Sequence, residues 1–224
     1  MDDTLAARMD ADGVAVVESV LTAAECAEVS SWFDEDERFR STVDMARHAY
    51  GRGRYRYFAD PLPPLVAQLR TELYPPLAEV ANAWAERLGE RTYPTTHAEL
   101  RAECTAAGQR RPTPLLLRYG PGDHNRLHQD VYGDLTFPLQ LLVMLSRPDE
   151  DFTGGEGVFV EQRARQQSLP RVLRPRQGDA VVFPVHHRPE RGARGDHRVQ
   201  VRHGVSQVHD GRRDVLGIIF HDAP

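Results

Sequence analysis

The feature that most constrains the fold is a change of texture after Arg111. From there on, short β-type runs are separated by Gly, Pro and Asp clusters such as Pro121-Gly122 and Gly178-Asp179. Short apolar runs bounded by turn residues are typical of strands. Many such strands within about 110 residues predict a sandwich or barrel of the jelly-roll kind. The predicted strands cover Leu115–Tyr119, Phe137–Leu145, Gly157–Glu161, Val172–Arg174, Ala180–Val185, Arg198–Val208 and Val215–Phe220.

The first 110 residues are predicted to be mostly helical. A capping-box pattern at Thr22 and Glu25 opens one helix, and a long apolar repeat at helical spacing supports another. Pro75 and Pro76 fall inside that repeat and should break or kink the helix. With no internal repeat or linker, we predict one domain over residues 1–224, with a helical layer (1–110) on a jelly-roll core (111–224). The predicted elements of this layer are a strand at Val14–Val17 and helices at Thr22–Phe33, Leu65–Leu88 and His97–Ala107.

Composition places the chain among ordinary globular proteins. Hydrophobic residues make up 40% and charged residues 27%. No apolar run approaches the length of a membrane span, and the acidic start lacks the pattern of a secretory signal. Cys26 and Cys104 stand alone in helical sequence, which fits a reducing compartment. We therefore expect a cytoplasmic protein without membrane association, and the sequence predicts no particular oligomeric state.

Charge excludes some functions. The formal net charge is −5, whereas a general nucleic-acid binder usually carries a basic surplus, because phosphate neutralisation dominates affinity. Every basic residue is Arg, and the chain contains no Lys. A Schiff-base or other catalytic-lysine mechanism is thereby excluded.

A candidate metal site begins at His128-Gln-Asp130. Two residues apart on an extended chain, His128 and Asp130 point to the same side. They supply two of the three ligands of a 2-His-1-carboxylate facial triad. In Arg198–His203, alternation places His203 on the apolar face of a predicted strand, so His203 is the preferred third ligand.

His186 and His187 are the main rivals to His203 as third ligand. They follow a predicted strand, so they are equally consistent with a pocket lining or with loop residues that have no role. The following stretch, Arg188–Arg198, is rich in Gly, Arg and charge and is expected to form a mobile loop or lid.

Several motifs resemble the iron(II)/2-oxoglutarate oxygenase superfamily, a prolyl-hydroxylase-like group with a double-stranded β-helix. More narrowly, the chain is similar to bacterial oxygenases described as acting on damaged DNA, and this resemblance covers nearly the whole chain. It implies Fe(2+), 2-oxoglutarate and O2 as cofactors, with His128, Asp130 and His203 as catalytic metal ligands. The superfamily motifs are Tyr119…Gly122…His128-Gln-Asp130, Gly154-Gly155-Glu156, Gly178-Asp179 and His203-Gly-Val…Gly211-Arg-Arg213; the narrower ones include MARH, GRGRYRYF, HQDVYGD, FTGGE and RHGVS.

The resemblance also implies a cofactor-binding arginine and tyrosine. In the superfamily, a basic residue about ten positions after the second His binds the distal carboxylate of 2-oxoglutarate. Arg213 stands ten positions after His203 and Arg212 nine. Arg212 shares its strand face with Asp214, which suggests solvent, so Arg213 is preferred, because an inward guanidinium can bind a carboxylate in a fork. Tyr119 resembles the tyrosine that hydrogen-bonds the co-substrate.

The segment Arg47–Phe58 interleaves four arginines with four aromatic residues. Such a pattern suits single-stranded nucleic acid or a small anionic or aromatic substrate. It is equally typical of an exposed hairpin with one aromatic face packed on the barrel. The role of the segment therefore stays open.

The implied reaction is hydroxylation of a C–H bond, with succinate and CO2 as co-products and ascorbate as an optional reductant. Our preferred substrate is a small molecule or amino-acid-type group. One alternative is oxidative demethylation of alkylated nucleobases, which needs a flipped base or a single strand. A second alternative is a non-enzymatic or cupin-like metal-binding jelly roll, which has no need for an arginine at position 213.

Overall fold

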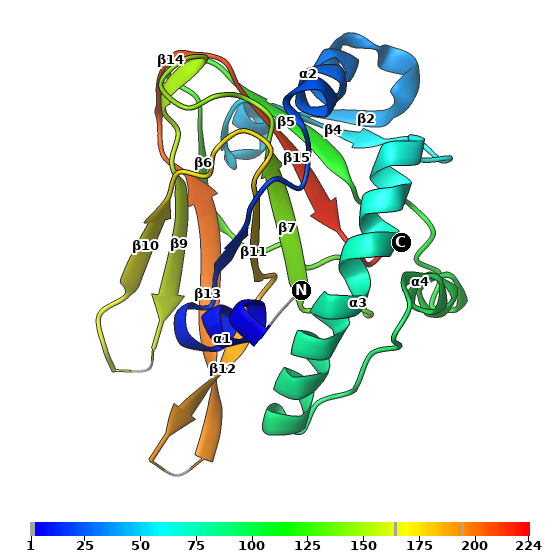
Figure 1. Cartoon of the computed structure of the whole chain (residues 1–224), viewed down its shortest axis with the longest axis vertical. Coiled ribbons are helices and arrows are strands. Elements are labelled where there is room, and N and C mark those ends of the chain that lie inside the picture. The colour runs from blue at the N-terminus through cyan, green and yellow to red at the C-terminus, as the bar shows by residue number, and fades with distance from the viewer. Residues whose placement is uncertain (1–2, 164, 194) are drawn as a thin grey trace.

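Two antiparallel sheets face each other in the computed structural model, which describes residues 3–163, 165–193 and 195–224 (Figure 1). The larger sheet has the order β1 (Ala15–Val17), β11 (Ala180–Pro184), β7 (Leu139–Met144), β15 (Arg213–Ile219), β5 (Leu115–Tyr119), β4 (Arg54–Phe58) and β2 (Phe39–Asp44). The smaller has the order β10 (Leu169–Leu173), β9 (Gly157–Gln162), β13 (Gly195–Val205), β6 (His124–His128) and β3 (Gly51–Arg52), with β12 (His187–Gly192) paired to β13. A separate pair joins β14 (Val208–Gly211) to β8 (Phe152–Gly154). This arrangement is the predicted double-stranded β-helix with N-terminal helices.

The helices all precede the first core strand, β5, in the described chain. They are α1 (Asp3–Asp12), α2 (Ala23–Ser31), α3 (Pro64–Leu88) and α4 (His97–Ala106), with 3₁₀ turns η1 (Trp32–Asp34), η2 (Asp36–Arg38) and η3 (Met45–His48). The capping box predicted for α2 is present, with the Thr22 side chain accepting from the Glu25 amide. No helix in the described ranges is long and apolar enough to cross a membrane.

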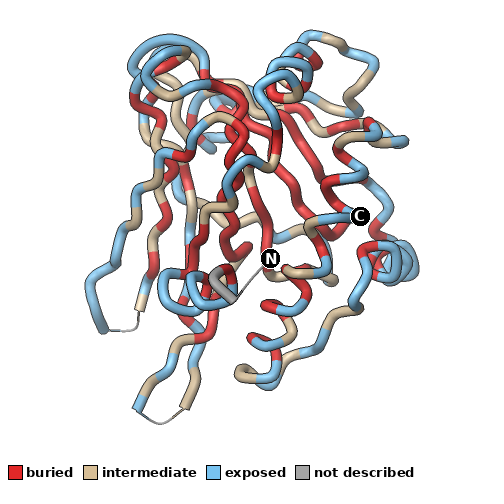
Figure 2. Tube along the Cα trace, viewed as in Figure 1, coloured by how far each residue is buried: buried red, intermediate tan, exposed pale blue. Residues whose placement is uncertain are grey.

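The main hydrophobic core lies between the larger sheet and helix α3. Strands β7, β11 and β15 are apolar along almost their whole length, because both of their faces are covered. From the helix side, Leu69, Leu77 and Trp84 pack into this core. Figure 2 shows the resulting band of buried strands behind an exposed helical surface. The core strands are thereby fixed in position for the residues on their other, inward face.

Helix α3 continues through Pro75 and Pro76, so the predicted break is wrong. Each proline removes one backbone hydrogen bond. The residues on either side, Tyr74 and Leu77, are fully buried in the core, and that packing outweighs the local loss.

Two other segments form strands. Residues 39–58 lie within the layer expected to be mostly helical but form β2, β3 and β4, with β4 paired to core strand β5, in line with the hairpin that was one interpretation of Arg47–Phe58. The stretch Arg188–Arg198, expected to be a mobile loop, instead forms the β12–β13 hairpin, which extends from the barrel at the bottom of Figure 1. Arg188 is buried at its base, with Nε 2.6 Å from Glu161 Oε1. Strand pairing and this ion pair hold a sequence whose Gly and Arg content alone suggests a loop.

Candidate metal centre

Two neighbouring strands of the smaller sheet bring the candidate ligands together. His128 ends β6 and lies directly opposite His203 on β13. Asp130 follows β6 by two residues, so its carboxylate turns back toward both rings. In the described part of the chain, these three residues are the group of His, Cys, Asp and Glu side chains that lie close enough to hold one metal ion.

The three donor groups converge on one point. His203 Nε2 lies 3.2 Å from Asp130 Oδ2, and His128 Nε2 lies 3.5 Å from Asp130 Oδ1. The two imidazole centroids are 4.2 Å apart. His128 Nδ1 lies 2.8 Å from the Arg126 carbonyl, which can only accept, so Nδ1 carries the proton. The Nε2 lone pair of His128 is thereby left for a metal.

The electrostatics favour the ligand protonation states. Burial is the main cause that lowers the pKa of His128, and the charge of the neighbouring His203 lowers it further. Both effects favour a neutral imidazole at His128. Burial alone would raise the pKa of Asp130, but the hydrogen bond and charge of His203 lower it below its usual range. Two imidazoles and one carboxylate are the donor set of a non-haem iron(II) site, and a neutral His128 and an ionised Asp130 are the forms that bind a metal.

The rival histidines lie in a different network. His186 Nδ1 is 2.8 Å from His187 Nδ1, and His187 Nε2 is 2.9 Å from Glu90 Oε1 at the end of α3. The connection to the metal centre runs through the backbone, because Gln129 Nε2 donates to the His186 carbonyl. The geometry therefore favours His203 over this pair as the third ligand.

Arg213 and Tyr119 face each other at one end of the cavity that also contains the metal centre. They are cross-strand partners on β15 and β5, and the Arg213 guanidinium lies 5.4 Å from the centroid of the Tyr119 ring. Both side chains are 1% exposed. Burial lowers the pKa of Arg213 to about 10 and raises that of Tyr119 to about 12. Arg213 Nε and one Nη are buried without a hydrogen-bond partner, so the site presents an unsatisfied cation to the cavity.

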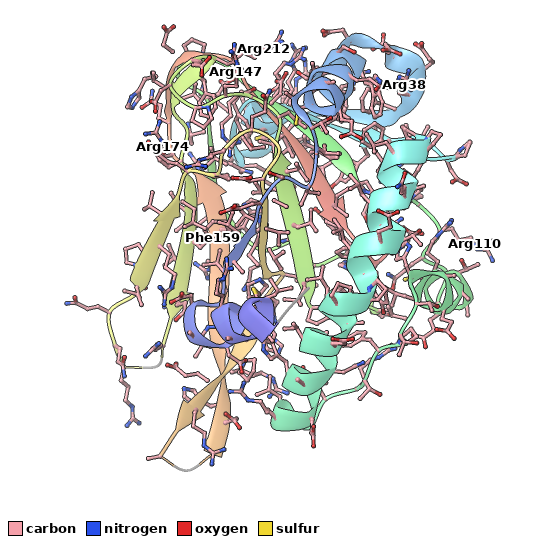
Figure 3. All side chains as sticks on the ribbon, in the orientation of Figure 1. Arg38, Arg110, Arg147, Phe159, Arg174 and Arg212 are labelled. Atoms are coloured by element: carbon pink, nitrogen blue, oxygen red, sulfur yellow. The ribbon has the colours of Figure 1, made fainter. Side chains whose placement is uncertain are left out.

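Arg212 points the other way. Its side chain is 62% exposed, and Figure 3 shows it at the upper end of the molecule. The prediction of a solvated Asp214 on the same strand face is wrong, because Asp214 is buried. Arg118 Nε donates to Asp214 Oδ1 at 2.9 Å beneath helix α2.

The metal group and Arg213 line a single cavity of about 450 Å³. Three further polar side chains line it that the sequence reasoning left without a role: Tyr57, Tyr132 and Gln140. Tyr132 donates to Asp130 Oδ1 at 3.0 Å, and Tyr57 donates to the Tyr132 hydroxyl at 3.1 Å. Gln140 carried a usable signal, since it is the one polar residue in the apolar run of β7.

The Arg47–Phe58 segment divides by strand face. Tyr55 and Tyr57 point into the cavity, and Tyr50 lines its mouth. Arg56 points away and donates to the Phe33 carbonyl and to Asp36. The aromatic half of this segment therefore belongs to the cavity wall.

Comparison with known proteins adds relatives and fold neighbours. Uncharacterized protein Rv2227 of Mycobacterium tuberculosis is 46% identical over 167 residues, which cover 74% of this chain and 72% of that protein.

Three solved structures share the fold. A Pseudomonas putida prolyl-4-hydroxylase is 15% identical with a TM-score of 0.56, over 96% of this chain and 95% of that one. A 2OG-Fe(II) oxygenase family oxidoreductase from Burkholderia pseudomallei is 16% identical with a TM-score of 0.55, over 97% and 90%. HygX from Streptomyces hygroscopicus, solved with nickel, 2-oxoglutarate and hygromycin B bound, is 17% identical with a TM-score of 0.52, over 97% and 86%.

A family model covers most of the sequence. The model named Oxygenase-NA, described as "Oxygenase, catalysing oxidative methylation of damaged DNA", matches residues 53–223. The match includes β4, every strand from β5 to β15 and the whole candidate metal centre. This chain therefore belongs to the Oxygenase-NA family of oxygenases.

Proposed function

We propose that the protein is an Fe(II)/2-oxoglutarate-dependent dioxygenase that hydroxylates a C–H bond of a small-molecule or amino-acid-type substrate. The observation that carries the proposal is the pairing, in one cavity, of a His-Asp-His group with a buried guanidinium that lacks a partner. A metal-binding jelly roll without 2-oxoglutarate chemistry gains nothing from an unpaired buried cation, which costs folding free energy. The cupin-like alternative therefore explains His128, Asp130 and His203 but not Arg213.

In this proposal, His128, Asp130 and His203 would hold the iron(II). Arg213 binds the distal carboxylate of 2-oxoglutarate, since its planar fork matches a carboxylate, and Tyr119 adds a hydroxyl at the same end. When bound, iron(II) with 2-oxoglutarate supplies the activation of O2 that drives hydroxylation, with succinate and CO2 as co-products. The surrounding protein keeps the substrate oriented and water out.

The test is succinate formation from 2-oxoglutarate by the purified protein with iron(II), ascorbate and air. We expect slow succinate release even without the primary substrate, and its loss in Asp130→Ala. Binding of 2-oxoglutarate should be measured in parallel, by calorimetry with zinc in place of iron. If the protein neither forms succinate nor binds 2-oxoglutarate, the non-enzymatic or cupin-like function is favoured instead.

A second candidate function is oxidative demethylation of alkylated nucleobases. The observation in its favour is the cavity mouth, where Tyr50 is 51% exposed, Leu127 is 45% exposed and the Arg126 backbone donates to the Tyr50 carbonyl. Exposed aromatic surface beside arginine suits a stacked base next to a phosphate. The description of the family model also names damaged DNA.

Titration with a single-stranded oligonucleotide at low and high salt tests this candidate. Binding that weakens with salt would support it, because released counterions dominate such affinity. Arg126→Ala, at the cavity mouth, should then reduce the salt slope by about 1. Arg110→Ala, which projects beside α4 in Figure 3, is the matched control. Absence of salt-dependent binding would remove this candidate.

A further inference from the structure

The cavity is longer than the co-substrate needs. Along β15, Arg213, Val215, Gly217 and Ile219 all line it. Six residues of extended chain span about 20 Å, whereas 2-oxoglutarate is a five-carbon diacid that reaches from the metal to Arg213. A second arm of the cavity therefore lies beyond Asp130, and we call it the substrate arm. Its lining comprises Tyr57, Leu115, Tyr132, Gln140 and Ile219.

The register of the larger sheet assembles this arm. Gln140 on β7 lies opposite Ile219 on β15, and Leu115 on β5 lies opposite both Tyr57 and Gly217. Tyr132 closes the arm from the loop after Asp130, through its hydrogen bond with Tyr57 at 3.1 Å. Strand pairing therefore holds all of these residues except Tyr132, which its hydrogen bond with Tyr57 fixes.

Charged groups are nearly absent from the substrate arm. Among the described residues that line the whole cavity, the charged side chains are Arg126, Asp130 and Arg213. Asp130 is directed at the metal point, Arg213 lies at the opposite end, and Arg126 is an exposed residue that donates to the Ala49 carbonyl at the mouth. A charged substrate group inside the arm would lose its hydration without an opposite charge to replace it.

The arm does offer unsatisfied hydrogen-bonding groups. Gln140 is 2% exposed, and its amide lies beside the Asp130 carboxylate, whose pKa it helps to lower, while Nε2 makes no well-aligned hydrogen bond with any described residue. The Tyr57 hydroxyl donates its hydrogen bond to the Tyr132 hydroxyl, so the lone pairs of the Tyr57 oxygen can accept a hydrogen bond from a ligand. The arm thus presents the Gln140 amide and the Tyr57 oxygen on a mostly apolar and aromatic wall, to which Tyr55 adds a further hydroxyl. A buried amide left unpaired costs free energy, so a ligand that pairs with it is favoured.

We propose that the substrate arm binds an uncharged amide group, either a lactam or a carboxamide, of a small-molecule substrate. Gln140 donates to the amide carbonyl, and Tyr57 accepts from the amide N–H. This inference rests on the proposed oxygenase function, because it names the substrate class of the same cavity. It makes Gln140 and Tyr57 specificity-determining residues.

Matched fragment pairs test the proposal directly. Nicotinamide and nicotinate share one shape but differ in charge, and 2-pyrrolidinone and pyrrolidine differ in the carbonyl and in charge. Binding of each is measured by ligand-observed NMR to the protein loaded with zinc(II) and 2-oxoglutarate, so that the Arg213 end is already filled. We expect each neutral amide to bind at least about tenfold more tightly than its charged counterpart.

Variants then locate the binding. Gln140→Leu should weaken nicotinamide binding about five- to tenfold, the worth of one buried hydrogen bond, while 2-oxoglutarate binding stays intact. Gln68→Leu, an exposed site on α3, is the matched control. If Gln140→Leu does not fold, the near-isosteric Gln140→Glu replaces it. The added carboxylate should abolish the preference for 2-pyrrolidinone over the pyrrolidinium cation and keep the preference for nicotinamide over nicotinate.

Equal binding of charged and neutral partners, or a Gln140→Leu protein that binds nicotinamide like the wild type, would overturn the inference. Failure of the proposed function looks different. In that case zinc(II) and 2-oxoglutarate do not bind at all, and the fragment preference is still readable on the metal-free protein.

Discussion

The two ends of the cavity recognise ligands by different physics. At one end, Arg213 and Tyr119 are buried, and the Arg213 guanidinium, which has unpaired N–H groups among the described residues, can bind an anionic group. At the other end, Tyr57 and Gln140 offer only neutral hydrogen-bonding groups. Both ends share strands β5 and β15, to which β4 adds Tyr57 and β7 adds Gln140 at the neutral end.

That difference explains how one cavity can hold two ligands, each at its own end. A buried unpaired cation binds a carboxylate strongly, because each partner removes the other's desolvation cost. Neutral hydrogen bonds contribute less each and serve mainly to select shape and polarity. The charged end therefore fixes the co-substrate, and the neutral end discriminates among substrates. Asp130 stands between them and belongs to both halves, through the histidines on one side and Tyr132 on the other.

The largest expected effect comes from removing this dividing carboxylate. In Asp130→Ala, metal affinity should fall by more than about 100-fold, because loss of a direct ligand exceeds the 10- to 100-fold typical for a hydrogen-bonded partner of a ligand. Cobalt(II) titration against a coloured chelator measures it. His186→Ala is the control, since its imidazole bonds to His187. Loss of metal affinity in His186→Ala, with none in Asp130→Ala, would move the metal site to the rival histidines.

The charged end is tested by Arg213→Met. Affinity for 2-oxoglutarate should fall about 100-fold, since a charge-assisted hydrogen bond contributes about 1.5–3 kcal/mol. In the absence of 2-oxoglutarate, the same variant should be more stable than the wild type by about 1 kcal/mol, because an uncompensated buried charge is gone. Calorimetry and thermal unfolding measure the two effects. Arg212→Met, on an exposed side chain, should change neither. A destabilised Arg213→Met protein would show that its guanidinium already has a partner.

The link between the ends is tested by Tyr132→Phe. Removing the hydroxyl that donates to Asp130 at 3.0 Å should lower metal affinity about tenfold, as expected for a hydrogen bond that orients a ligand. The control is Tyr93→Phe, whose buried hydroxyl bonds to the Thr136 carbonyl elsewhere in the core. Unchanged metal affinity in Tyr132→Phe would mean that the two ends are independent.

Local sequence rules predicted the charged end better than the neutral end. The spacing of His128 and Asp130, and the alternation that turns His203 inward, depend only on strand geometry within a few residues. The preference for Arg213 over Arg212 came from the family resemblance, with strand parity as added support, and the exposed Asp214 that this support invoked is in fact buried.

What local rules missed depends on contacts between distant segments. Gln140 becomes a site residue only because β7 lies beside β15, and Tyr57 only because β4 joins the larger sheet. The same cause explains α3, where packing against the core overrides two prolines, and the β12–β13 hairpin, where pairing overrides a loop-like composition. Sequence reasoning recovers residues whose role is set by local geometry, and it loses those whose role is set by pairing.

The smallest effect expected concerns the shape of the charged end. Gly155 has a φ of +62°, and an added Cβ would lie 2.9 Å from both Arg213 Cδ and Val208 Cγ2. Gly89, at the end of α3, has a φ of +65° with nothing within 4 Å. Both Gly→Ala changes should therefore cost about 1 kcal/mol of folding free energy through the left-handed backbone.

Only Gly155→Ala should also weaken 2-oxoglutarate binding, by about tenfold or less, because it displaces Arg213. Comparing the two proteins by thermal unfolding and 2-oxoglutarate calorimetry separates backbone strain from the loss of the anchor. Equal 2-oxoglutarate affinity in both would mean that Arg213 tolerates movement and that charge, rather than fit, governs its end of the cavity.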